Sequence, residues 1–256
     1  WTFFTDASPK LAPVYLKGRL YFGADDGRLY CLDAVNGSLV WEVAVAPTNA
    51  KMLGQERFGS KWPIRSGGMI EDGIFYVTAG LFPSEGIYFC AVNIEDGSFV
   101  WRKRLDNAGV GSSESPQGYM LATDDSIFMT SRVSPTRWSK KDGHKIGFTT
   151  PFPEVKRSHE YRFLCAGDYA QIWNGKNIVF GQACLLGYDP DIEYTDKYRR
   201  KLKGGLIFNW FNARQAVFKK DLAFLATDYY VAAVRQDRLP QLSKNECREF
   251  EDDVYK

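Results

Sequence analysis

Two acidic pairs that precede a glycine are the first candidates for chemistry in this sequence. They stand at Asp25-Asp26-Gly27 and Glu95-Asp96-Gly97, and clustered carboxylates of this kind can bind Ca²⁺. Neither pair is followed by the further acidic ligands and the bidentate Glu that complete a Ca²⁺ loop. Acidic residues before glycine are also typical of turns, because their side chains bond the backbone two residues on. We therefore interpret both pairs as turns and expect no metal site.

The cysteines and histidines show no pattern of metal ligands or of a nucleophile with its base. The five cysteines are far apart and form no C-x-x-C or C-x-x-C-H motif, which excludes a thioredoxin-type site and covalent c-type haem. We expect Cys31 and Cys90 to be small buried hydrophobes. His144 and His159 lack paired-ligand spacing and are interpreted as surface residues. Gly109-Val-Gly-Ser-Ser113 is neither a nucleophile elbow nor a phosphate loop, so we predict no catalytic residue.

The composition favours one β-rich domain without nucleic-acid or membrane chemistry. Of 256 residues, 45% are hydrophobic and 15% aromatic, and Gly (23) and Pro (11) separate short apolar runs, as expected for many short strands. A net charge of +2 lacks the marked basic character of a nucleic-acid-binding domain. No apolar run approaches the ~20 residues of a membrane span. The chain starts at Trp1 without a leader, so we expect its start, with any targeting signal, to have been removed.

An internal repeat is the most informative feature of the sequence. One copy ends Asp33-Ala-Val-Asn-Gly37-Ser-Leu-Val-Trp41 and the next ends Asn93-Ile-Glu-Asp-Gly97-Ser-Phe-Val-Trp101. In both, an Asp or Asn is followed four residues later by Gly and four further by Trp. The Asn-Gly and Asp-Gly pairs predict two-residue hairpin turns, where Gly accepts a positive φ. The Trp falls on the outermost strand, where its ring can pack into the neighbouring unit.

Each repeat reads as four short strands, which is the pattern of a β-propeller blade. We therefore predict an all-β fold, a β-propeller of four-stranded antiparallel blades, in one domain over residues 1–256. The later copies have lost the Asp–Gly–Trp ending, and no clear fourth strand follows Val234. About five blades are visible, and they cover approximately residues 11–46, 66–105, 118–150, 165–190 and 205–238.

The start of the chain aligns with the end of a blade. Trp1-Thr-Phe-Phe-Thr5 matches Trp41-Glu-Val-Ala-Val45, so the chain opens on the last strand of a blade whose beginning is absent. Either this strand closes the final blade as a small ring, or the chain is an arc of a larger propeller. We favour the arc, from a ring of seven or eight blades. An arc has exposed strand edges, which missing sequence or a partner must cover.

The repeat resembles the tryptophan-docking motif A-x-D-x-x-T-G-x-x-x-W of the pyrroloquinoline-quinone (PQQ)-like propeller repeat proteins. The resemblance is strong over residues 13–101 and fades through 118–235. Ser60-Lys-Trp-Pro63 and Ser115-Pro-Gln-Gly118 are similar to inter-blade segments of the bacterial, planctomycete-type members. The superfamily includes the PQQ-dependent alcohol dehydrogenases and the non-catalytic, BamB-like assembly proteins, so it implies the fold without deciding the activity.

The resemblance also bears on cofactors and location. The quinone enzymes of this superfamily have adjacent cysteines beside PQQ, oxygen ligands for calcium, and an Asp base. This sequence has no adjacent cysteines, so we expect no cofactor, although PQQ and calcium stay open. Relatives of the repeat usually work outside the bacterial cytoplasm, which favours a periplasmic location.

The long connections between blades suggest a binding face. In a blade of strands A to D, the B–C and D–A connections leave one face, and long loops on a rigid scaffold often bind. Several of these segments are cationic, 189–205 among them. We predict a site for a small anionic ligand, alongside a non-catalytic scaffold function for a protein partner or a missing part of the propeller. The predicted ligand-binding residues are Trp62, Arg65, Gln117, Arg132 and Arg137.

Overall fold

The computed structural model describes residues 1–54, 57–82, 85–105, 116–130, 136–148, 167–182, 185–195, 201–210 and 213–241. Their regular structure is almost entirely β-strand, with a short 3-10 helix, η2 (Gln236–Gln241), near the end. Within these ranges, no helix has the length and apolar character needed to cross a bilayer. The chain divides into two compact units, residues 1–129 with 138–145, and residues 130–137 with 146–256.

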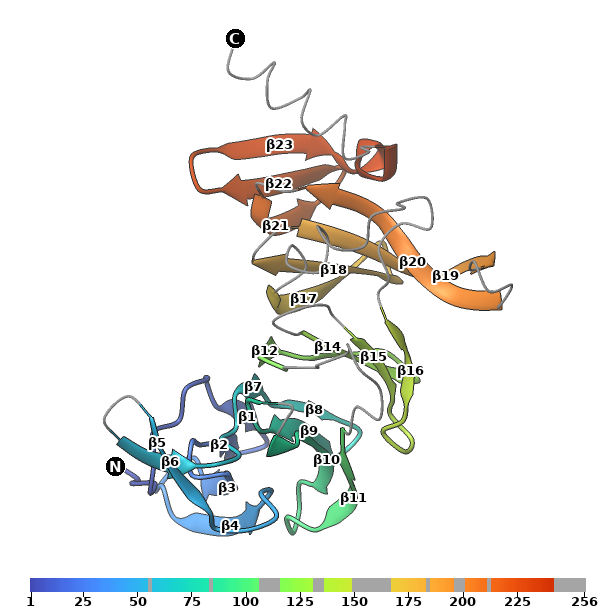
Figure 1. Ribbon diagram of the computed structural model, residues 1–256. Helices are drawn as coiled ribbons and strands as arrows, with labels where there is room; N and C mark the ends of the chain where they lie inside the picture. The colour runs from blue at the N-terminus through green and yellow to red at the C-terminus, as the bar shows by residue number, and fades with distance from the viewer. Residues whose placement is uncertain are drawn as a thin grey trace. The chain divides into compact units, whose positions relative to one another are not determined.

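Two four-stranded antiparallel sheets form most of the first unit (Figure 1). The expected strand patterns are confirmed in both, and the Lys17-Gly18 turn between the first two strands has positive φ at both residues. The first sheet is β1 (Val14–Leu16), β2 (Arg19–Gly23), β3 (Arg28–Asp33) and β4 (Leu39–Ala44). The second is β8 (Met69–Glu71), β9 (Ile74–Ala79), β10 (Tyr88–Asn93) and β11 (Phe99–Arg104).

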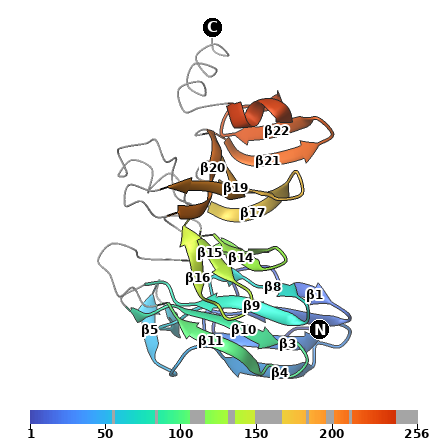
Figure 2. The ribbon, with the colours of Figure 1, turned by 90° about the vertical axis from the view of Figure 1, so that its right-hand side faces the viewer.

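The two sheets pack face to face around one apolar cluster. Tyr21 and Leu29 of the first sheet meet Phe75 and Val77 of the second, and the rings of Tyr21 and Phe75 lie 6.0 Å apart. Alternate residues of each strand face this cluster, as the period of two in a strand requires. Figure 2 shows β9, β10 and β11 side by side.

Short strands lie between and beyond these sheets. A hairpin of β5 (Lys51–Gly54) and β6 (Arg57–Ser60) interrupts the connection from β4 to β8. β7 (Ser66–Gly67) pairs in parallel with β12 (Gly118–Tyr119), which joins the segments that lead into the second and third sheets. The third sheet is β13 (Leu121–Ala122), β14 (Ser126–Met129), β15 (Thr136–Ser139) and β16 (Lys145–Phe148).

The second unit holds the fourth and fifth sheets. The fourth is β17 (Gly167–Trp173), β18 (Asn177–Gln182), β19 (Leu185–Thr195) and β20 (Lys201–Trp210). The fifth is β21 (Ala213–Lys219), β22 (Leu222–Thr227) and β23 (Val231–Arg235). Ala223 and Leu225 of the fifth sheet pack with Val179 and Leu185 of the fourth in one cluster.

The fourth sheet differs in extent from the expected blade. It runs to Trp210 instead of ending near residue 190, and most of 189–205 is a strand hairpin, β19 and β20, instead of a long loop. The cationic run of that segment therefore follows the third strand of its sheet, at a C–D connection. The expected D–A placement of 189–205 was wrong, because the polar, charged sequence concealed two strands with alternating character.

Tryptophan indoles link consecutive sheets of the first unit. The buried Trp41 of β4 donates its indole N–H to the carbonyl of Ile94 in the second sheet, at 3.0 Å. Its ring covers Gly97, where an added Cβ would lie 2.9 Å from a ring carbon. In the same way Trp101 of β11 donates to Lys140, at 3.3 Å, and covers Gly143.

The N-terminal residue repeats this arrangement on the first sheet. The indole N–H of Trp1 donates to the carbonyl of Ala34, at 3.3 Å, and the ring covers Gly37. Each acceptor lies one residue after the Asp, Asn or Ser that starts the turn, and each glycine lies four residues after it. The sequence spacing is thus the spacing that one indole needs to reach both a carbonyl and a glycine.

The turns under these indoles are longer than expected. Gly37 N–H donates to Asp33 C=O, and Asp33 N–H donates to Ser38 C=O, so four residues lie between the closing pair. A two-residue turn at Asn36-Gly37 is therefore wrong, although the positive φ of Gly37, +74°, was expected. The predicted side-chain bonds are present, because Asp33 Oδ1 accepts from Val35 N–H.

A partly buried tyrosine connects the fourth and fifth sheets and gives a pH prediction. Tyr169 Oη accepts the backbone N–H of Ala216 at 3.0 Å, and burial raises the pKa of Tyr169 to about 12. Because the folded pKa exceeds the unfolded value of about 10, stability is fully present below pH ~10 and is lost as the pH rises through ~12.

We expect the unfolding free energy of this unit to fall between these pH values, and less steeply in Tyr169→Phe. Urea unfolding at a series of alkaline pH values measures this. If the unfolding free energy falls with pH equally steeply in both proteins, the raised pKa of Tyr169 is contradicted.

Candidate functional site

Trp62, the first of the predicted ligand residues, is buried. Its indole N–H donates to the carbonyl of Glu85 at 2.9 Å, and its ring meets Tyr88 edge-on at 6.2 Å. The neighbouring Lys61 forms an ion pair with the Glu85 carboxylate. These contacts tie the connection that enters the second sheet to the β9–β10 connection. Trp62 therefore has a packing role, and little of its surface is open to a ligand.

Arg65 is engaged by a carboxylate of the first sheet. Its Nε and Nη2 donate to Asp25 Oδ1 and Oδ2 at 2.6 and 2.9 Å. This two-pronged geometry is the strong form of a carboxylate–guanidinium pair. The Asp25 side chain is 14% exposed and that of Arg65 is 33% exposed. The pair therefore clamps the β2–β3 turn to the segment before β7, and the Arg65 guanidinium has a partner within the protein.

Of the other predicted ligand residues, the structure describes Gln117 and Arg137. Gln117 is half-buried in the segment before β12. Arg137 belongs to the second unit, and its guanidinium donates to Pro190 C=O at 3.5 Å. Arg132 lies outside the described residues. A single site formed by all five residues remains a prediction. Trp62 and Arg65 both have partners within the protein.

The acidic pairs form turns, as expected. Asp26 Oδ1 accepts from Arg28 N–H at 2.9 Å, and its Oδ2 accepts from the Tyr30 hydroxyl at 2.7 Å. In the other pair Asp96 accepts from the side chain and backbone of Ser98, which lowers the pKa of Asp96.

The histidine and cysteine interpretations are confirmed where the structure describes them. His144 is exposed, and its Nδ1 lies 2.6 Å from Asp142. Hydrogen bonds from Ser139 and His144 hold the pKa of Asp142 well below its usual range. Cys31 and Cys90 are buried and unpaired, and burial raises the pKa of both thiols, so neither is an activated nucleophile. His159 lies outside the described residues.

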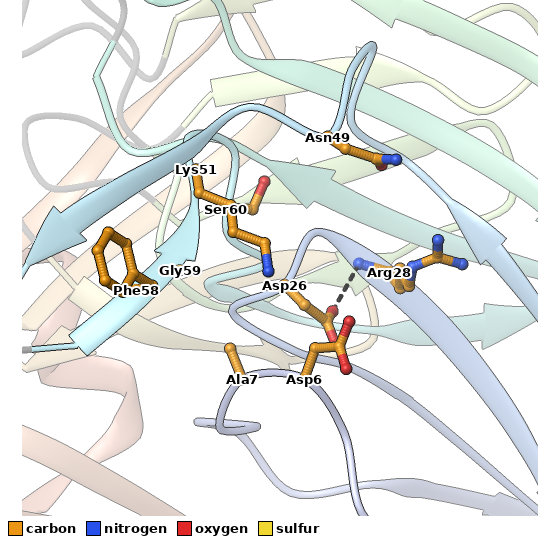
Figure 3. A pocket seen from close by; sticks show the side chains of 9 residues that line it. All are labelled: Asp6, Ala7, Asp26, Arg28, Asn49, Lys51, Phe58, Gly59 and Ser60. Atoms are coloured by element: carbon orange, nitrogen blue, oxygen red, sulfur yellow. Dashed lines mark hydrogen bonds between the residues drawn. The ribbon is translucent and has the colours of Figure 1, made fainter.

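A small pocket was missed by sequence reasoning. It has a volume of about 180 Å³, and Figure 3 shows Asp6, Ala7 and Asp26 along one side, with Asn49 and Lys51 across from them. Phe58, Gly59 and Ser60 of β6 and Arg28 complete its lining. It is formed by the N-terminal segment that holds Asp6 and Ala7, and by the β2–β3 turn and the β4–β8 connection, the B–C and D–A segments of the first sheet. Its residues are scattered in the sequence, and no spacing motif marks them.

The hairpin beside the pocket carries an exposed apolar pair. Leu53 and Phe58 lie opposite each other on β5 and β6 and are 65% and 69% exposed. An isolated two-stranded hairpin is marginally stable in water, and exposed apolar side chains gathered in this way commonly mark a contact surface. Lys51, on the same strand as Leu53, lines the pocket. The hairpin and the pocket therefore form one continuous surface.

The described residues do not fit a quinone with its calcium ion. In the ranges given above, no cluster of three or more His, Cys, Asp or Glu side chains could hold a metal. The two cysteines that the structure describes lie on β3 and β10, so they form no adjacent pair.

Comparison with known proteins defines the class of this fold. Residues 1–116 match the family model described as outer membrane protein assembly factor BamB. BamB from Moraxella catarrhalis superposes with a TM-score of 0.54 at 10% identity, over 88% of this chain and 60% of that protein. A quinohemoprotein alcohol dehydrogenase from Comamonas testosteroni gives 0.55 at 12% identity, over 90% and 43%. The predicted all-β fold, a β-propeller of four-stranded antiparallel blades, is confirmed.

Curated relatives by sequence are dehydrogenase subunits of quinone alcohol dehydrogenases. The subunit from Gluconacetobacter polyoxogenes is 31% identical over 136 residues, 51% of this chain and 17% of the relative. That from Gluconobacter oxydans is 34% identical over 135 residues, 52% and 16%. This chain therefore spans about a sixth of the length of these relatives. This similarity does not by itself transfer an activity.

Proposed function

We propose that this chain is a non-catalytic β-propeller module that binds a protein partner through the β5–β6 hairpin and the adjoining pocket. The observation that carries the proposal is the exposed pair Leu53 and Phe58. The pair lies at the end of the first sheet from which the B–C and D–A connections emerge. Long connections on a rigid sheet scaffold are where binding concentrates.

The packing of the indoles supports a scaffold function. Trp41 and Trp101 are used to hold neighbouring sheets together, which is the tryptophan-docking function suggested by the repeat. Two of the predicted ligand residues, Trp62 and Arg65, are likewise taken up by contacts within the protein. The aromatic and cationic groups that suggest ligand chemistry in the sequence thus stabilise the scaffold.

The chemistry of the surface specifies the kind of partner. An apolar side chain of the partner would lie between Leu53 and Phe58, and polar groups at its edge would enter the pocket. There Asp6 offers a carboxylate and Lys51 an ammonium group. A protein loop with an apolar anchor and mixed charges matches this surface, because apolar anchors provide most of the affinity and polar rims the specificity. With the BamB-like repeat, this favours an extracytoplasmic binding partner.

Site-specific photo-crosslinking tests the proposal. A benzoylphenylalanine at position 58 should give one adduct of defined mass in extracts of the native host. The same probe at position 100 should give none, because Val100 is exposed on β11, away from the hairpin. Adding Leu53→Asp should reduce the yield of the adduct roughly tenfold, since anchor residues commonly contribute more than 1 kcal/mol. Equal labelling at both positions would contradict the proposal.

A quinoprotein oxidoreductase is the second candidate, and the similarity to quinone alcohol dehydrogenase subunits favours it. The test is to add PQQ and Ca²⁺ to the protein and to separate free quinone by gel filtration. Quinone absorbance that elutes with the protein would support this candidate over the binding module. Absorbance only in the free fraction is the result expected for the binding module.

A further inference from the structure

The pocket beside the β5–β6 hairpin is lined by charged side chains that are not paired within the protein. Asp6 and Lys51 are exposed, and neither forms an ion pair with any residue that the structure describes. Asp26 is half-buried, and the hydrogen bonds to its carboxylate come from neutral donors, Arg28 N–H and the Tyr30 hydroxyl. The three charged groups therefore remain able to attract a charged occupant.

The balance of these charges favours an occupant with one positive charge. The guanidinium of Arg28, which also lines the pocket, is neutralised by the carboxylate of Glu42 at 2.8 Å. Two carboxylates, Asp6 and Asp26, and one ammonium group, Lys51, then face the pocket, which leaves one negative charge in excess. Because binding surfaces are complementary in charge, a monocation matches this set better than an anion or a neutral zwitterion.

The volume limits the occupant to about one amino-acid residue. The pocket has about 180 Å³, roughly the space of six water molecules at ~30 Å³ each. Sites for drug-sized ligands and cofactors measure ~300–1,000 Å³, so this pocket is too small for them. Residues 1–5 lead away from the pocket to the Gly37 turn, where Trp1 docks, and they do not supply the occupant.

The direction of Lys51 favours an amino terminus over other cations. Figure 3 shows the Lys51 side chain extending toward Asp26. A metal ion or the ammonium group of a lysine side chain would face this like charge without offering it an acceptor. An amino terminus carries the carbonyl of its own residue. That oxygen can accept from Lys51 or from the amide of Asn49, while the terminal ammonium donates to the carboxylates.

We propose that the pocket binds the free amino terminus of the partner polypeptide, with its ammonium group on Asp6 and Asp26 and its first carbonyl on Lys51. Capture of a terminal amine is an established mode of peptide recognition. The first side chain of the partner then lies against Phe58, which lines the pocket and also belongs to the exposed apolar pair. This inference rests on the proposed function and specifies which part of the partner enters the pocket.

Titration of the chain with L-leucinamide, followed by ¹H–¹⁵N NMR, tests the ligand chemistry. This probe has an ammonium group, a carbonyl and an apolar side chain. It should shift the amide signals of Arg28 and Gly59 with a millimolar Kd, as expected for so few atoms. N-acetyl-L-leucinamide, which keeps the side chain but lacks the charge, should cause no shifts. Equal shifts with the acetylated probe, or a tighter Kd for the zwitterion L-leucine, would overturn the proposal.

Two substitutions test the role of each charge. Asp6→Asn should weaken binding of L-leucinamide about fivefold, the upper end for an exposed ion pair. Lys51→Met should also weaken binding of L-leucinamide, but not that of isopentylamine, which has no carbonyl. The matched control is Asp124→Asn, at an exposed carboxylate outside the pocket, and it should have no effect. Equal effects of the substitutions at positions 6 and 124 would count against the proposed contact.

The pH dependence distinguishes an amino terminus from an alkyl ammonium group. An α-amino group titrates near pH ~7.7–8.0 and the ammonium of a lysine near ~10.4. Because the pocket binds the protonated form, L-leucinamide should lose affinity about tenfold between pH ~7 and ~9, whereas isopentylamine should keep its affinity. The same charged groups face both probes, namely Asp6, Asp26, Arg28 and Lys51. An equal loss for both probes would place the titration on the protein and overturn the proposal.

Failure of this proposal and failure of the proposed function give different results. A photo-adduct at position 58 without binding of L-leucinamide would overturn the amino-terminus proposal and leave the binding module intact. Binding of L-leucinamide without an adduct would support the ligand chemistry of the pocket and contradict the binding module.

Discussion

Replacement of Trp41 by alanine should lower the free energy of unfolding of the first unit by about 3–5 kcal/mol, the range for a large aromatic residue removed from a core. The indole is buried between two sheets, its N–H donates to Ile94, and its ring packs at 6.0 Å from Tyr21. The measurement is urea unfolding followed by circular dichroism.

Two matched variants separate the parts of this effect. Trp41→Phe keeps an aromatic ring but loses the indole N–H, so it should cost about 1 kcal/mol for the hydrogen bond plus a smaller packing loss. Trp1→Ala removes the same motif where the ring is largely exposed, and it should cost less than Trp41→Ala. An alanine at position 41 that costs no more than one at position 1 would contradict the interpretation of Trp41 as inter-sheet packing.

Replacement of Arg65 by methionine should destabilise the first unit by about 2–3 kcal/mol. The change leaves the mostly buried carboxylate of Asp25 without its two charge-assisted hydrogen bonds. A fully buried pair broken in this way costs about 3–5 kcal/mol. The partial exposure of Arg65 reduces that figure, because solvent screens the remaining charge.

A double-mutant cycle shows whether loss of the Arg65–Asp25 ion pair causes this destabilisation. Asp25→Asn in the Arg65→Met background should cost less than Asp25→Asn alone, because the unpaired charge has already been created. The two singles and the double are compared by chemical unfolding. If the two costs simply add, the pair is not coupled and Arg65 is free to serve a ligand, as the sequence suggested.

The repeat made much of the fold predictable. The Asp/Asn–Gly–Trp spacing at 33–41 and 93–101 recurs because the Trp of one copy covers the carbonyl and the glycine of the next, as Trp41 covers Ile94 and Gly97. A spacing that repeats in this way is visible in a sequence. The third copy has no Trp at position 147, yet its turn at Gly143 still receives Trp101. Where the motif faded, the extent of strands became uncertain, and the hairpin of β19 and β20 was taken for a loop.

The site was much less predictable than the fold. Arg65 and Trp62 were chosen for their chemical type, but their partners, Asp25 and the Glu85 carbonyl, lie 40 and 23 residues away. A sequence does not show which cation already has a carboxylate. The pocket of Asp6, Asp26 and Lys51 combines three segments for the same reason, and the exposed pair on β5 and β6 depends on a cross-strand register.

Hydrogen exchange of the indole N–H groups, followed by ¹⁵N NMR, tests most directly whether Trp41 joins two sheets. The N–H of Trp41 should exchange slowly, at a rate limited by unfolding, because it is buried and bonded to Ile94. That of Trp1, with most of its ring exposed, should exchange much faster. If the Trp41 N–H exchanges as fast as that of Trp1, or shifts when quinone and Ca²⁺ are added, the indole is not inter-sheet packing and the account is wrong.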